Sequence, residues 1–268
     1  MDRQLRPTVG ALLREWRTQR RLSQLDLASS AGVSTRHLSF IETGRSRPSR
    51  EMVLHLAEQL EVPLRDRNAL LLAAGHSPSY TSTDFESDAM QPVRAALDHV
   101  LRSHEPFPAL VVNRRWELVA ANAGLAPLLT GVSEELLAPP VNVMRVALHP
   151  YGVAPRIVNF DEWSAHLMQR LRRQFVLTRD ADVGALYDEL RTYPGVVADD
   201  VVESDTAGAL AVPLRLSTAD GELAFLSTVT TFGTAVDITL AELTIEAFLP
   251  ADEATRQAIA DQGVDVET

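Results

Sequence analysis

The sequence predicts two folded domains of different class, an all-helical domain at the N-terminus and an α+β domain after it. Apolar residues recur at intervals of three and four through residues 9–75, as they do on the buried face of helices. Runs typical of strands appear only later, in residues 107–122 and 209–250. Between these patterns, residues 77–91 lose periodicity and gain Ser, Thr and Asp, which predicts a linker.

The composition provides enough hydrophobic residues for the cores of both domains, and it argues against several classes of protein. The chain has 268 residues, of which 46% are hydrophobic, enough to fill two cores of ordinary size. It contains no 18-residue apolar run, and charges are spread through its first 21 residues, so we expect neither a membrane span nor a signal peptide. Without cysteine there is no disulfide framework and no thiolate metal site. We expect a cytoplasmic protein.

Charge is distributed unevenly along the chain, although its net value is −11. Residues 1–76 contain 12 Arg against 8 acidic residues, a net +4, whereas the remainder contains 13 Arg against 28 acidic residues, a net −15. A basic N-terminal domain suits a nucleic-acid partner, and an acidic second domain is repelled by DNA. The sequence therefore places nucleic-acid binding in the N-terminal domain.

Two short helices joined by a glycine turn are predicted within residues 22–49. Ser23 can cap a helix of about 24–31 whose third interior position, Asp26, suits the positive end of the helix dipole. Gly32 then supplies the turn. Ser34 caps a second helix that begins near Thr35 and ends at Gly44. This arrangement is the helix-turn-helix that reads DNA with its second helix.

The candidate base-reading residues lie on the outward face of the second helix. Leu38 and Ile41 are predicted to point into the core. The outward positions near the start of the helix, where base edges are reached in the major groove, are then Thr35, Arg36, Ser39 and Phe40. Arg36 suits guanine O6 and N7, while Thr35 and Phe40 suit a thymine methyl group.

Three further residues are candidates for phosphate contacts. Gln24 opens the first helix, where its side chain and backbone N–H would face phosphates. Arg45 and Arg47 follow the second helix in a loop that would track the DNA backbone, and they should add affinity more than specificity. The alternative is a compact helical domain with a solvated basic loop.

The pattern SQ-x-x-LA-x-x-AGVS-x-x-x-L-x-x-I-E-x-GR-x-x-PS in this stretch resembles the Xre/Cro-type family of bacterial and phage regulators. The resemblance implies the lambda-repressor-like five-helix bundle of that family. The flanks fit this expectation, because residues 9–16 and 53–60 carry apolar stripes and Pro63 begins a further helix closed by Gly75. We therefore expect a DNA-binding domain over residues 1–76.

The remaining elements predict an α+β domain. Residues 77–104 are expected to form the linker and a connecting helix that begins at Pro92. Two short strands of a hairpin follow over residues 107–122. After several helices come three further strands, within residues 209–217, 222–233 and 240–250. The expected helices span about 123–131, 141–148, 161–174 and 182–192. Residues 256–268 are expected to form a flexible acidic tail.

This second part resembles the ligand-binding domain of the MmyB-like transcription regulators. The stretches that carry the likeness are FPALVVNRRWELVAAN, HPYGVAPRIVNFDEWSAHLMQRLRRQ and ELAFLSTVTTFGTAVDITLAELTIEAFLPADEAT. The resemblance implies a PAS-like sheet over residues 105–255 that holds a fatty acid. A fatty-acid site needs an apolar tunnel and a polar group at its mouth for the carboxylate.

Arg156 is the first candidate for that polar group, because it lies in a loop among apolar residues near His149 and Asn159. The alternative is an arginine that fastens the loop to a carboxylate such as Asp161 or Glu162. The other ligand-binding candidates are Trp116, Asn122, Phe160 and Trp163. Each has a structural alternative, since an aromatic residue is often plain core and an Asn often a helix cap.

No catalytic or metal site is predicted, because HExxH, GxSxG, P-loop and strand-linked GxGxxG patterns are absent from the sequence. We therefore expect a regulator and not an enzyme, without cofactor unless a fatty acid is bound. We expect it to bind a double-stranded DNA operator as a homodimer, because one small module binds weakly and two combine their contacts on a pseudo-palindrome. The alternative is a second domain that only dimerises or docks a protein partner, without a ligand.

Overall fold

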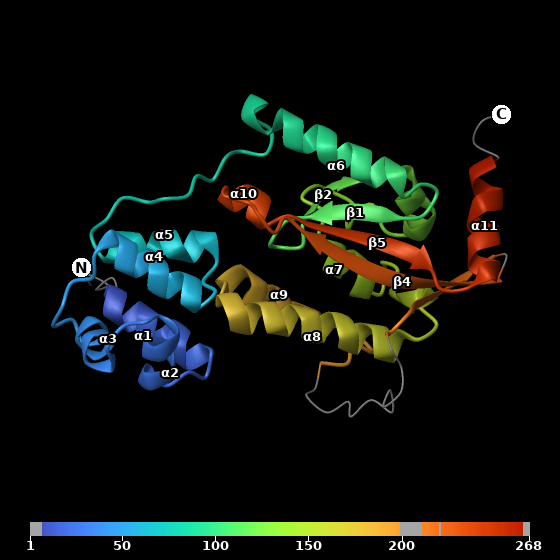
Figure 1. Ribbon diagram of the computed structural model, residues 1–268. Coiled ribbons are helices and arrows are strands. Elements are labelled where there is room, and N and C mark those ends of the chain that lie inside the picture. Colours follow the sequence, from blue (N-terminus) through green and yellow to red (C-terminus); the bar gives the residue numbers. More distant parts are fainter. Residues whose placement is uncertain (1–6, 199–210, 220, 265–268) are drawn as a thin grey trace. The chain divides into compact units, whose positions relative to one another are not determined.

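The computed structural model describes residues 7–198, 211–219 and 221–264, and the chain divides into two compact units (Figure 1). The first unit comprises Met1–Thr83 together with Thr234–Ala241, and the second comprises Asp84–Gly233 and Glu242–Thr268. The first unit is helical and the second combines helices with an antiparallel sheet, so the predicted fold class is confirmed.

The N-terminal segment of the first unit folds into five helices, as the sequence predicts. Their order is α1 Val9–Gln19, α2 Gln24–Ser30, α3 Thr35–Glu42, α4 Arg50–Gln59 and α5 Leu64–Ala73. Hydroxyl side chains begin four of them, because Thr8, Ser23, Ser34 and Ser49 each accept a hydrogen bond from a backbone N–H of the first turn. At α2 the capping box is reciprocal, since the Asp26 carboxylate also accepts from the Ser23 backbone N–H.

Tight packing between helices fixes the core of this unit. Leu13, Leu27, Leu38 and Leu56 are fully enclosed within it. Gly10 lies against α3 so closely that a Cβ atom there would collide with the backbone carbonyl of Ile41. A glycine at this position therefore lets α1 approach α3.

A segment from between two strands of the sheet belongs to the first unit. Its helix, α10, spans Ile238–Ala241, and the residue before it, Asp237, pairs in a parallel bridge with Thr81. One carboxylate oxygen of Asp237 accepts hydrogen bonds from the Thr81 hydroxyl at 2.8 Å, the Thr83 hydroxyl at 2.7 Å and the Thr83 backbone N–H at 3.0 Å. The sequence placed this segment within the second domain, whereas these long-range hydrogen bonds attach it to the first.

The second unit is built on a five-stranded sheet in the order β2-β1-β5-β4-β3. All neighbouring strands are antiparallel; the predicted hairpin β1–β2 is present, and β3 and β4 form a second hairpin. The strands span Ala109–Val112, Leu118–Ala121, Leu214–Thr218, Gly221–Thr231 and Thr244–Pro250. Because β5 lies between β1 and β4, the last strand occupies the centre of the sheet.

Helices cover the two faces of this sheet (Figure 1). On one face lies α6 Gln91–Ser103, and on the other lie α7 Val143–Leu148, α8 Phe160–Thr178 and α9 Ala181–Leu190. The main core forms between the sheet and α7–α9, where Phe225, Met144 and Leu171 are enclosed. Short 3-10 segments, η1 Asp88–Met90, η2 Ala123–Leu129 and η3 Ala154–Arg156, complete the unit.

Two elements differ from the sequence predictions. The helix expected at about 123–131 is the 3-10 segment η2, which contains Pro127 and therefore lacks a backbone donor. The flexible tail expected from residue 256 instead contains α11 Glu253–Val264. Thr255 and Ile259 are buried and α11 packs on β4 and β5, which accounts for its order, while residues 265–268 lie outside the described residues.

Candidate functional site

The second helix of the helix-turn-helix presents the predicted face. Leu38 and Ile41 are fully buried, as expected from their spacing. On the opposite side Arg36 is exposed, and Thr35, Ser39 and Phe40 are half-buried. Gly32 has a φ of 63°, in the left-handed region that the turn before α3 requires.

Two arginines lie against the ring of Phe40. The guanidinium carbon of Arg36 is 5.4 Å from the ring centroid and that of Arg45 is 5.9 Å from it. The backbone N–H groups of Arg45 and Ser46 both donate to the Phe40 carbonyl. These hydrogen bonds hold the loop that follows α3 against the end of that helix. Within the described ranges, Arg36, Arg45 and Arg47 have no carboxylate partner, so this face keeps its positive charge.

Gln24 is placed differently from the expected phosphate contact. Its side-chain amide donates a 2.8 Å hydrogen bond to Glu42 Oε2, so it is used inside the domain. At the start of α2 the Asp26 backbone N–H donates to Ser23 Oγ and the Asp26 carboxylate accepts from the Ser23 N–H, so this helix end is also used inside the domain. A phosphate contact by Gln24 stays a prediction. Its side-chain partner Glu42 lies 18 positions away, so no local pattern in the sequence indicated this hydrogen bond.

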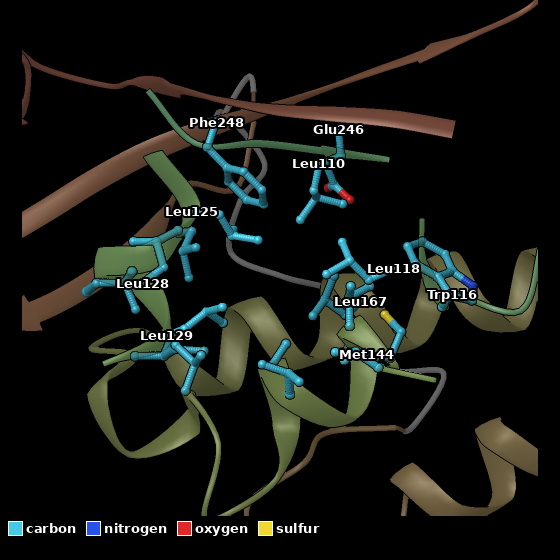
Figure 2. Close-up of a pocket in the computed structure, with 18 of the residues that line it drawn as sticks. Leu110, Trp116, Leu118, Leu125, Leu128, Leu129, Met144, Leu167, Glu246 and Phe248 are labelled. Atoms are coloured by element: carbon cyan, nitrogen blue, oxygen red, sulfur yellow. The ribbon is translucent and has the colours of Figure 1, made fainter. Parts of the chain in front are cut away.

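The second unit contains an apolar cavity of about 320 Å³, partly open to the surface, between its sheet and the helices α7 and α8 (Figure 2). Leu110 and Phe248 line it from the sheet, and Met144 and Leu167 line it from the helices. Leu128 of η2 and Trp116 lie on opposite sides of the view in Figure 2. A volume of this size falls at the lower end of the range for small-molecule sites, about 300–1,000 Å³.

Trp116 is held in the cavity wall by an unusual backbone conformation and two side-chain contacts. Its φ is 63°, a left-handed conformation that bulky residues seldom adopt. The indole Nε1 donates to Gln174 Oε1 at 2.7 Å, and the guanidinium of Arg170 lies 4.9 Å from the ring centroid. Both partners belong to α8, so the tryptophan links the β1–β2 turn to that helix.

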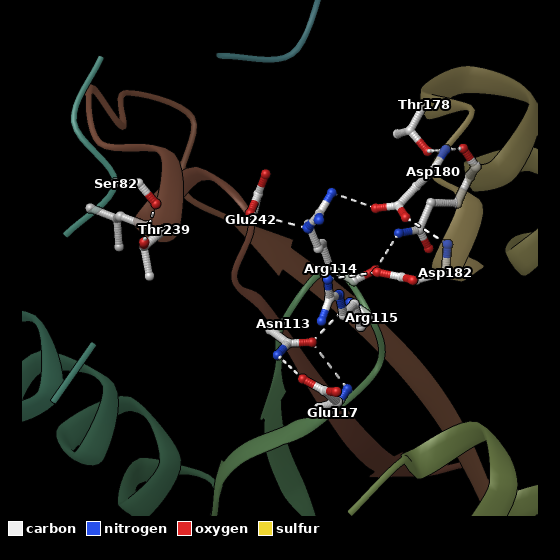
Figure 3. A network of polar contacts seen from close by, with 12 residues as sticks. Ser82, Asn113, Arg114, Arg115, Glu117, Thr178, Asp180, Asp182, Thr239 and Glu242 are labelled. Atoms are coloured by element: carbon white, nitrogen blue, oxygen red, sulfur yellow. Dashed lines mark hydrogen bonds and ion pairs between the residues drawn. The ribbon is translucent and has the colours of Figure 1, made fainter. Parts of the chain in front are cut away.

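A polar network fixes the turn that carries Trp116 (Figure 3). Asn113 Oδ1 accepts from the backbone N–H groups of Arg115 and Glu117, at 2.8 and 3.1 Å. Arg114 forms an ion pair with Asp180, the residue that caps α9, and its Nε lies 3.7 Å from Glu242 Oε2. The network therefore joins the β1–β2 turn, the α8–α9 junction and the residue two positions before β5.

Glu246 is the one charged side chain that lines the cavity among the described residues, and the sequence analysis did not select it. It is only 5% exposed and lies in β5, where its Oε1 accepts a 2.7 Å hydrogen bond from Arg170 Nη1. An acidic residue in the middle of the apolar strand TIEAFLP was the signal that could have revealed it.

Arg156 lies at the η2 side of the cavity but is not one of its lining residues. Its guanidinium donates to the backbone carbonyl of Leu128, a residue that lines the cavity. Val153 and Ile157, which lie before and after Arg156 in the sequence, also line the cavity. Neither Asp161 nor Glu162 forms an ion pair with it within the described part of the chain. Burial lowers the pKa of Arg156, because no carboxylate compensates its loss of solvent.

The other predicted ligand contacts divide into two groups. Trp163, like Trp116, lines the cavity. His149, Asn159, Asn122 and Phe160 are not among its lining residues.

Asn122 bonds instead to the backbones of Ala109, Leu101 and Phe107, and Asn159 bonds to those of Pro213 and Arg215. His149 accepts from the Tyr151 backbone N–H, and Phe160 packs on the core. The two asparagines thus fasten chain segments that are distant in sequence.

Neither a cluster of metal ligands nor a membrane-crossing helix is present in the described residues. They contain no group of three or more His, Cys, Asp or Glu placed to hold a metal ion. None of their helices is both long enough and apolar enough to cross a bilayer.

Comparison with known proteins matches both units to families. Residues 93–261, well over half of the chain, match the MmyB-like transcription regulator ligand binding domain. Residues 13–66 match a helix-turn-helix family. Uncharacterized HTH-type transcriptional regulators of Mycobacterium tuberculosis and Mycobacterium bovis are 38% identical over 69 residues, 26% of this chain. The match spans only 27% of the length of those relatives.

Among solved structures, the crystal structure of the clp gene regulator ClgR from Corynebacterium glutamicum is similar at 26% identity. The alignment covers 38% of this chain and 99% of ClgR, with a TM-score of 0.23.

Proposed function

This chain belongs to the family defined by the MmyB-like transcription regulator ligand binding domain, and from this premise we propose that it is a DNA-binding regulator controlled by an apolar ligand. Its first unit binds double-stranded DNA, and its second unit binds a small apolar molecule such as a fatty acid. The apolar cavity of about 320 Å³ is the observation that carries the proposal.

DNA binding is supported by the face of α3 and by the loop that follows it. Arg36, stacked on Phe40, is positioned to reach base edges together with Thr35 and Ser39. Arg45 and Arg47 are exposed and without carboxylate partners in the described ranges, which suits phosphate contacts. Two copies on a pseudo-palindromic operator would combine these contacts.

Ligand binding is supported by the unfilled space between the sheet and α7–α8. Protein interiors are close-packed, so an apolar void of this size would normally be destabilising unless something occupies it. An alkyl chain in the cavity would contribute about 0.8 kcal/mol per buried methylene group. Arg156, at the η2 side, is the candidate partner for a carboxylate.

The chain itself suggests how the cavity influences the DNA-binding unit. Glu246 and Phe248 line the cavity from β5, and β5 begins three residues after α10. The segment Thr234–Ala241 belongs to the first unit, to which Asp237 attaches it. A ligand that shifts β5 would therefore also move the segment Thr234–Ala241, whose helix α10 contacts α5. In a dimer this movement would change the relative positions of the two α3 helices, and with them the affinity for DNA.

Identification of the copurifying molecule tests this function most directly. The purified full-length protein would be extracted with organic solvent and the extract analysed by mass spectrometry, and DNA affinity would be measured before and after extraction. We expect an aliphatic molecule near one equivalent and a change in operator affinity on its removal. A protein without any bound or bindable aliphatic molecule would contradict the ligand-binding part.

A second candidate function is favoured by a separate observation. Phe175, Val176 and Leu177 near the end of α8 are 38%, 51% and 40% exposed, so three apolar side chains are accessible around this end of the helix. On this alternative the second unit only dimerises or docks a protein, and no ligand binds. Light scattering of the protein with and without Val176→Asp measures whether this surface joins two copies.

A further inference from the structure

From the geometry around Glu246 we infer that the apolar cavity selects a ligand that carries a hydroxyl group, bound by the free carboxylate oxygen of Glu246. The inference rests on the proposed ligand-binding function and deepens it. It concerns the end of the cavity at β5 and Trp116, and a carboxylate at the Arg156 end is compatible with it.

The first step is that one oxygen of Glu246 is already used. Its Oε1 accepts the 2.7 Å hydrogen bond from Arg170 Nη1, and the guanidinium of Arg170 lies over the Trp116 ring. The side chains of Glu246 and Arg170 are 6% and 18% exposed, so solvent competes little for this ion pair. The carboxylate is thereby fixed in one orientation.

The second step concerns Oε2, which has no hydrogen-bond partner in the described part of the chain. No side-chain oxygen or nitrogen there is both fully enclosed and unpartnered, so Oε2 must border open space. Glu246 is a lining residue of the cavity, and Figure 2 shows its carboxylate pointing from the sheet toward the interior. The open space that Oε2 borders is therefore the cavity.

The third step is the chemistry of the surroundings. A lone acceptor in an apolar wall is costly unless a donor reaches it. Trp116 Nε1 donates to Gln174 and Nη1 of Arg170 donates to Oε1, and no donor within the described ranges reaches Oε2. A donor carried by the ligand would satisfy Oε2 inside the apolar cavity.

A carboxylate ligand group does not meet this requirement. At this end of the cavity it would place a second negative charge beside Glu246 in an apolar environment, which is unfavourable. An ammonium group would meet the positive charge of Arg170. A hydroxyl group is neutral and donates one hydrogen bond, so it matches the single free oxygen.

The test compares 1-dodecanol with 1-methoxyundecane, which has the same number of heavy atoms but no donor, and with dodecanoate. Binding to the delipidated protein would be measured by calorimetry and by tryptophan fluorescence. Trp116 and Trp163 line the cavity, so their fluorescence should change when a ligand binds. A hydrogen bond to a charged acceptor predicts that the alcohol binds at least about tenfold more tightly than the ether.

Glu246→Gln supplies the discriminating variant. Its amide oxygen can keep the hydrogen bond from Arg170, which leaves the amide NH₂, a donor, where Oε2 was. We expect the preference for the alcohol to disappear and affinity for the ether to rise. Glu222→Gln, the same change at an exposed ion pair in β4, should retain the wild-type ratio.

Equal affinity of the wild-type protein for alcohol and ether would overturn the inference, and so would a ratio that Glu246→Gln leaves unchanged. The comparison on the wild-type protein stands even if the variant fails to fold. If alcohol, ether and dodecanoate all fail to bind, the proposed ligand-binding function fails as well. Binding of all three without preference contradicts this inference alone.

Discussion

Arg17 of α1 and Glu42 at the end of α3 form a two-armed ion pair inside the DNA-binding unit. Nε donates to Oε1 at 2.7 Å and Nη2 donates to Oε2 at 2.9 Å. The side chain of Glu42 is 1% exposed, and it also accepts a hydrogen bond from Gln24 of α2. Glu42 thus links α1, α2 and α3, which carry the proposed DNA-contact face, and its hydrogen bond raises the pKa of Arg17.

Removing one partner of this pair should destabilise the first unit strongly. Arg17→Met leaves the Glu42 carboxylate buried without its cation, which costs about 3–5 kcal/mol. The double variant Arg17→Met, Glu42→Leu removes both charges and should recover most of that loss. Urea unfolding measures both free energies. A double variant as unstable as the single one would contradict this expectation, because it would show that the ion pair itself supplies the stability. Arg256→Met, which removes one partner of an exposed ion pair in α11, is the control and should change the free energy of unfolding little.

Substitutions of two arginines should separate base reading from phosphate contact. Arg36→Ala should cost about 1–3 kcal/mol on the specific operator and relax the base preference, because Arg36 lies on the outward face of α3. Arg47→Ala should weaken binding to all sequences alike and lower the salt slope by about one unit. Fluorescence anisotropy on operator and random duplexes, over a range of salt, distinguishes them. Identical behaviour of the two variants would place the recognition surface elsewhere.

Loss of the Arg156 guanidinium should weaken carboxylate ligands selectively. Arg156 is partly buried without a carboxylate partner in the described ranges, so a ligand carboxylate would compensate its lost hydration. We expect Arg156→Met to reduce affinity for dodecanoate about tenfold, while 1-dodecanol is little affected. Calorimetry measures both, and Arg191→Met, on the surface at the end of α9, serves as the control. Equal losses for the two probes would mean that Arg156 only supports the cavity wall.

Asp237 should be needed for coupling between the units but not for either binding event. Asp237→Ala removes the acceptor for Thr81 and Thr83 and so detaches the segment Thr234–Ala241. We expect ligand affinity and operator affinity of the ligand-free protein to stay within about twofold, and the change of operator affinity on ligand binding to shrink. Asp188→Ala, a surface carboxylate of α9, should leave the coupling intact. An undiminished ligand effect would exclude this route.

The stability that Asp237 contributes to the folded protein should depend on pH, and the direction of the pKa shift fixes the direction of that dependence. Burial alone would raise the pKa of Asp237, but hydrogen bonds from Thr83 and Thr81 outweigh it and the net pKa is lowered from 3.8. A lowered pKa means that the stabilisation is fully present above 3.8 and is lost as the pH falls below that value through the folded-state pKa. Thermal unfolding of wild type and Asp237→Asn should therefore differ at neutral pH and converge in acid. A constant difference would contradict this assignment.

Much of the fold follows from patterns that are local in the sequence. The caps at Ser23 and Ser34, the turn at Gly32 and the inward spacing of Leu38 and Ile41 are each satisfied within a few residues, so the helix-turn-helix was predictable. The five strands were predictable for the same reason, because alternation is a property of consecutive residues. Those patterns also sufficed to name the candidate DNA face of α3.

Only the tertiary structure decided the interactions between residues that are far apart in sequence. It brings Gln24 to Glu42, pairs Glu246 with Arg170 at the cavity, and attaches Asp237 to Thr83. It also leaves Asn159 and His149, neighbours of Arg156 in sequence, outside the lining of the cavity. The physical reason is that a side chain's partner is set by which elements pack together, whereas sequence periodicity specifies only which face of each element is buried.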